Sequence, residues 1–87
     1  MHASDRPHLA DAAARILIKT GRIQELEAAL DLVRRRESAA VANLARYLAE
    51  PPASHWRIYG PPDCEKTIRE CRRHARILRR EIKSLEA

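Results

Sequence analysis

Apolar residues recur at alternating spacings of three and four from Leu9 to Tyr47, which is the pattern of one buried face on a long helix. Two lines of residues, offset by three, make up this seam. They are Leu9, Ile16, Ile23, Leu30, Glu37 and Leu44, and Ala12, Lys19, Leu26, Val33, Ala40 and Tyr47. No proline interrupts the seam, so we predict a first helix over residues 7–49, preceded by a frayed N-terminus at residues 1–6.

Gly21 is the point at which the first helix could be interrupted. Lys19-Thr20-Gly21 can end a helix, and a glycine inside a helix costs about 1 kcal/mol relative to alanine. A break there would give a three-helix bundle, and a DNA-binding helix-turn-helix would use Gly21 as its turn glycine. The polar neighbours of Gly21 do not suit a helix-turn-helix, and the seam keeps its register from Ile16 to Ile23. We therefore favour a continuous or kinked helix, with a break at residues 19–21 as the alternative.

A second seam with the same spacing lies near the C-terminal end of the chain. Its members are Cys64, Ile68, Cys71, Ala75, Leu78, Ile82 and Leu85. Asp63 follows Pro61-Pro62 and suits the N-cap position, so we predict a second helix over residues 63–86. Residues 50–62, which have a proline pair near each end, are predicted to form a stiff loop that joins two antiparallel helices.

The predicted loop carries three large side chains, Trp56, Ile58 and Tyr59. The favoured interpretation is that they fold back against the end of the helical hairpin. Two functional alternatives stay open: they anchor a partner protein, or they form a platform on which a nucleic acid base stacks.

The two predicted helices differ in length by about 18 residues, so the first would extend ~27 Å beyond the second. The extension would expose several apolar side chains, which favours association with another copy of the chain. The expected interface residues are Leu9, Ala13, Ile16, Leu17, Ile18 and Ile23. The predicted fold is all-α and has one domain, an antiparallel helical hairpin that forms a homodimeric, coiled-coil-like bundle. A break at Gly21 would remove the need for a partner.

Two charged residues, Lys19 and Glu37, occupy seam positions. Each is expected to extend its charge into solvent from the edge of the seam. Alternatively they fix the register, Glu37 through arginines of either helix and Lys19 through an acid of a partner chain, such as Asp11 or Glu25.

The chain has a net charge of +5, and its basic residues concentrate on one side of the second helix. This ridge comprises Arg69, Arg72, Arg73, Arg76, Arg79, Arg80 and Lys83. An ordinary solvated face is the favoured interpretation, and binding to nucleic acid or to an acidic protein are the alternatives. A second cluster, Arg34-Arg35-Arg36, is balanced by nearby acids and is weaker evidence.

The sequence predicts no catalytic, metal or cofactor site. His55, Cys71 and His74 could hold zinc, but the paired cysteine spacing of structural sites is absent. Cys64 and Cys71 are too far apart on one helix for a disulfide and are expected to be free thiols. No signal peptide or membrane span is recognisable, so a cytoplasmic protein is expected, and the arginine- and alanine-rich composition suggests a bacterial source.

These observations predict a small non-enzymatic interaction protein, an accessory or regulatory factor that works through helix packing and self-association. The alternative is a nucleic-acid-binding protein that uses the basic ridge.

Overall fold

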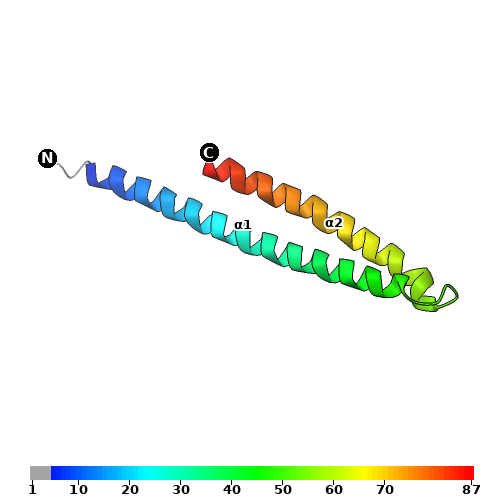
Figure 1. Ribbon diagram of the computed structural model, residues 1–87. Helices are drawn as coiled ribbons and strands as arrows, with labels where there is room; N and C mark the ends of the chain where they lie inside the picture. Colours follow the sequence, from blue (N-terminus) through cyan, green and yellow to red (C-terminus); the bar gives the residue numbers. More distant parts are fainter. Residues whose placement is uncertain (1–4) are drawn as a thin grey trace.

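A computed structural model describes the backbone of residues 5–87 and the side chains from residue 10 onward. Its described part consists of two helices, α1 (Asp5–Leu48) and α2 (His55–Glu86), which are joined by residues 49–54. The helices run antiparallel and pack along most of α2, while the N-terminal part of α1 extends beyond the C-terminus of α2 (Figure 1). The prediction of an all-α helical hairpin is confirmed.

The first helix is continuous through Gly21. It has 44 residues, which corresponds to a length of ~66 Å. It ends at Leu48, one residue before the predicted end, because Pro51 and Pro52 prevent continuation. Residues 5–6 are helical and not frayed as expected, and residues 1–4 of the predicted frayed segment lie outside the described part.

The second helix begins at His55, so the predicted loop at residues 50–62 and the predicted helix start at Asp63 are wrong. Residues 55–60 form helical turns ahead of Pro61 and Pro62, which lie inside α2. Prolines remove backbone donors and disfavour a helical conformation in the preceding residue. That residue is Gly60, which has no Cβ to clash with the proline ring. The connection is therefore short, and Ser54 occupies the N-cap position in an extended conformation.

The helices are held together by aliphatic and small side chains from the two predicted seams. Leu26 and Leu30 of α1 pack with Ala75 and Leu78 of α2, and all four are buried. The other buried apolar residues are Ala40, Cys64, Ile68 and Cys71. The packing between only two helices gives a thin rod, and the Cα radius of gyration is 21.7 Å, against about 12 Å expected for a compact domain of this length.

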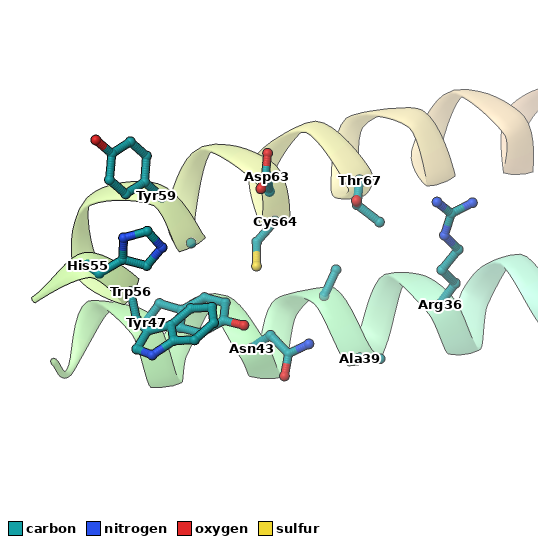
Figure 2. Close-up of a pocket in the computed structure, with 12 residues that line it drawn as sticks. Arg36, Ala39, Asn43, Tyr47, His55, Trp56, Tyr59, Asp63, Cys64 and Thr67 are labelled. Carbon is teal, nitrogen blue, oxygen red and sulfur yellow. The ribbon is translucent and has the colours of Figure 1, made fainter.

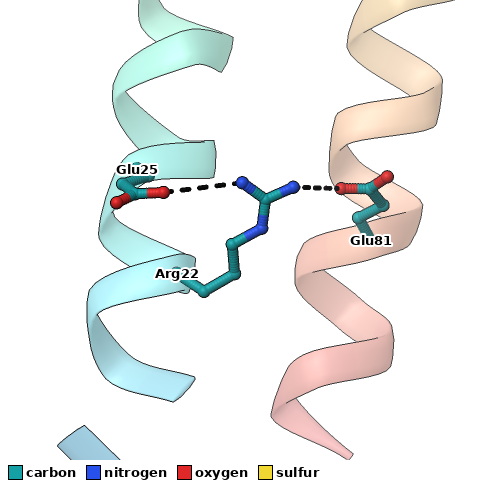
Figure 3. A network of polar contacts seen from close by, with 3 residues as sticks. All are labelled: Arg22, Glu25 and Glu81. Carbon is teal, nitrogen blue, oxygen red and sulfur yellow. Dashed lines mark hydrogen bonds and ion pairs between the residues drawn. The ribbon is translucent and has the colours of Figure 1, made fainter. Parts of the chain in front are cut away.

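Specific contacts fix how the helices are aligned. Near the turn, the Tyr47 ring of α1 lies against the backbone of Gly60 of α2. Near the other end of α2, the Arg22 guanidinium lies 3.5 Å from a carboxylate oxygen of Glu81 and 3.5 Å from one of Glu25 (Figure 3). Between these points, Nε of Arg72 donates a hydrogen bond of 3.2 Å to Glu37. These contacts set the register of the two helices, so that the N-terminal part of α1 extends beyond the end of α2 (Figure 1).

Candidate functional site

The first candidate surface is the N-terminal extension, which we define as residues 5–20 of α1. All side chains of residues 10–20 are exposed. They include three consecutive large apolar residues, Ile16, Leu17 and Ile18, which are 65%, 72% and 71% exposed. Ala13 is also exposed, Ile23 is half-buried, and the side chain of Leu9 lies outside the described residues. The structure therefore places most of the expected interface residues on an uncovered stretch of helix.

The apolar side chains of the extension do not lie on one side of α1. Ile16 continues the seam that carries Ile23 and Leu30, whereas Leu17 and Ile18 are each rotated further around the helix. One partner helix placed on the seam would cover Ile16 and leave Leu17 or Ile18 in water. Complete burial requires contact with more than one helix, as in a bundle.

The second candidate surface is the basic ridge, which we call the Arg face of α2. All seven of its residues are exposed. Arg72 is 66% exposed, as expected for a solvated face, but it turns toward α1 and pairs with Glu37, whose side chain is 27% exposed. An ion pair with this much solvent access contributes roughly 0.2–1 kcal/mol to stability. Glu37 therefore pairs with an arginine of α2. This pairing was the alternative to an unpaired Glu37 whose charge extends into solvent.

Lys19 is exposed on the extension. One of the acids suggested as its partner, Glu25, lies beside Arg22 of its own chain. Asp11, the other suggested acid, is exposed in the extension itself. The seam pattern did not indicate that Arg22 pairs with Glu81 of α2, because that contact depends on the register between the helices.

The third candidate surface is a groove between the helices near the turn, with a volume of about 370 Å³. Figure 2 shows polar side chains from both helices along it, among them Arg36 and Asn43 of α1 and His55 and Asp63 of α2. Asp63, expected to cap a helix, instead lines this groove. Sequence reasoning missed the groove, because it placed residues 55–60 in a loop.

Aromatic residues gather at the turn end of this groove. The Trp56 and Tyr47 rings stack with their centroids 5.9 Å apart, and the His55 and Tyr59 rings lie 4.8 Å apart. Trp56, Ile58 and Tyr59 were expected to fold back and cover the hairpin end, but all three stay more than half exposed. Trp56 contacts Tyr47 but is 56% exposed, and Ile58 and Tyr59 are 52% and 61% exposed. They lie on the first turns of α2, whose helical geometry turns them outward.

The residues considered for zinc are not brought together. Cys71 is a buried core residue, 3% exposed, whereas His74 is exposed and His55 belongs to the aromatic cluster. Within the described part of the chain, no group of three or more histidine, cysteine or acidic side chains is arranged to hold a metal ion. Cys64 and Cys71 are both free and buried.

Comparison with known proteins gives no relative: no protein-family model, curated protein or solved structure matches this chain. Neither helix, over the residues that the structure describes, has an apolar stretch long enough to span a bilayer.

Proposed function

We propose that this chain is a small non-enzymatic interaction protein, an accessory or regulatory factor that acts through helix packing and self-association. The observation that carries the proposal is the N-terminal extension, with Ile16, Leu17 and Ile18 each at least 65% exposed.

The extension gains stability from a partner in two ways. Burying a leucine or isoleucine side chain contributes roughly 1.5–3 kcal/mol, so three such residues provide a strong drive for association. In addition, α2 does not cover the extension, and most of the stability of a helix in a protein comes from packing of its apolar face. Contact with another molecule would bury the apolar groups and hold the helix at the same time.

A second copy of the chain is the partner that these features favour. Along the extension an acid, Asp11, precedes two bases, Arg15 and Lys19. An antiparallel copy would bring the acidic part of one extension toward the basic part of the other, as a twofold contact requires. Each hairpin also supplies two helices. The apolar side chains of the extension point to different sides of α1, so their burial needs contact with more than one helix. The proposed assembly is therefore a homodimer formed through the extensions.

Replacing Ile16 with aspartate is expected to convert the dimer into a monomer, because a charge would have to be buried in the interface. Sedimentation equilibrium of the full chain measures the oligomeric state. The concentration range is about 5–200 µM, which brackets a micromolar affinity. The matched control is Ile77→Asp, because Ile77 is an isoleucine that is 51% exposed on α2, away from the extension. The control should remain a dimer. A wild-type chain that is monomeric over the whole range, or a dimer lost only in the Ile77 variant, would contradict the proposal.

A further inference from the structure

The Arg face has a regular arrangement that self-association does not explain. Three of its members, Arg69, Arg76 and Lys83, are spaced by seven residues and form a middle row along α2. One flanking row consists of Arg72 and Arg79, and the other consists of Arg73 and Arg80. All three rows are exposed. The row of Arg72 and Arg79 borders α1, where both residues line a hollow with Glu37 and Ala75, and the other two rows lie farther from the buried seam of α2.

Packing against α1 draws acidic groups away from the Arg face. Glu81 of α2 lies 3.5 Å from Arg22 of α1, so its charge is directed toward the neighbouring helix (Figure 3). Glu37 of α1 reaches only the edge of the face, where it contacts Arg72. Among the described ion pairs, the other six cations of the face have no acidic partner. The fold thus leaves a continuous strip of positive charge.

The cations also surround an open hollow on the outer side of α2. It has a volume of about 510 Å³ and is lined by five cations and one acid, Lys66, Arg69, Glu70, Arg72, Arg73 and Arg76. Guanidinium groups that converge in this way can donate paired hydrogen bonds to phosphate oxygens.

We propose that the Arg face binds the sugar-phosphate backbone of duplex nucleic acid. A duplex has phosphate strands on both sides of each groove, and the major groove is about 12 Å wide and admits an α-helix. The two flanking rows match the two strands, while the middle row faces the groove between them. Single-stranded nucleic acid fits less well, because its binding sites stack bases on aromatic rings. The Arg face has no aromatic residue, and Trp56 and Tyr59 line the interhelical groove instead.

Binding is tested by fluorescence anisotropy with the full chain and a labelled duplex DNA of mixed sequence, about 20 base pairs long. Five phosphate contacts would give a slope of about −4.5 for the logarithm of the association constant against that of the salt concentration. Raising the salt from about 50 to 200 mM should then weaken binding by roughly 500-fold. Such contacts fix position and carry little sequence information, so a second duplex of different sequence should bind with similar affinity.

The decisive variant removes three cations of the flanking rows, Arg73→Gln with Arg79→Gln and Arg80→Gln. It should lose at least about tenfold in affinity at low salt, and its salt slope should become shallower by about 2.7, since each lost phosphate contact removes about 0.9. The matched control, Arg34→Gln with Arg35→Gln and Arg46→Gln, removes the same charge from α1. It should retain the wild-type slope. Circular dichroism checks that both variants keep the helical fold.

Three results would overturn the proposal. One is the absence of binding at 50 mM salt, and another is an equal loss in both triple variants, which would mean that net charge alone drives association. The third concerns the class of partner. If polyglutamate of equal charge displaces the duplex as well as unlabelled duplex does, or if single strands bind more tightly, the Arg face is not a duplex-binding surface.

Discussion

Replacing Leu30 with aspartate should unfold the hairpin at room temperature. Leu30 is 8% exposed and belongs to the cluster that joins the two helices. The change loses roughly 1.5–3 kcal/mol of burial and adds at least about 2 kcal/mol for placing a polar group in an apolar site. A core this small supplies no more than about 3–5 kcal/mol of net stability, so the loss is sufficient to unfold it. Far-UV circular dichroism during urea titration measures the result.

Leu32 provides the control for this experiment, because it is a leucine on the same helix that is 65% exposed. Leu32→Asp should change the free energy of unfolding by less than about 0.5 kcal/mol, as surface substitutions usually do. If the two variants were equally destabilised, the helices would not pack through the face that carries Leu30.

Replacing Gly60 with alanine should destabilise the hairpin at its turn end. The added methyl carbon would lie 2.5 Å from Cγ and 3.0 Å from Cε2 of Tyr47. Relieving the clash requires the Tyr47 ring to move and to give up its stacking on Trp56. Overpacking costs about 1–3 kcal/mol. The better helix propensity of alanine does not offset this loss, because a Cβ at residue 60 would crowd the ring of Pro61. We expect a net loss of about 1–3 kcal/mol in chemical denaturation.

Testing Gly60→Ala in a chain that also carries Tyr47→Ala separates the clash with Tyr47 from the other effects of Gly60→Ala. In a Tyr47→Ala chain, Gly60→Ala should cost much less, because the ring that it meets is gone. Gly21→Ala is the opposite control. No atom lies within 4 Å of the position of its new methyl group, so the change should stabilise α1 by about 0.5–1 kcal/mol. An unchanged penalty for Gly60→Ala after removal of Tyr47 would show that the ring does not set the helix spacing.

The seam spacing predicted the helical hairpin and its core because burial follows helical periodicity directly. Leu26 and Leu30 pack against Ala75 and Leu78, as their places in the two seams required. The uncovered N-terminal extension followed from the unequal lengths of the seams, although the longer α2 makes it shorter than predicted.

The error at residues 55–62 arose from local rules that tertiary packing overrides. Proline pairs usually stop helices, but here Gly60 relieves the crowding before Pro61 and lets α2 approach Tyr47. A signal was present in the sequence, since Gly60 lies four residues before Cys64 and extends the second seam backward. The groove was missed with this segment, and the contact between Arg22 and Glu81 could not be predicted, because it depends on the register of one helix against the other.

The chain contains its own chemical reporter of helix separation. Cys64 and Cys71 are unpaired, and both lie on the side of α2 that faces α1, where they are 8% and 3% exposed. Cys64 also borders the interhelical groove, whereas a thiol-specific reagent reaches Cys71 chiefly when the helices part. The rate at which Cys71 of the native sequence becomes alkylated therefore reports how often the rod opens, with no engineered label.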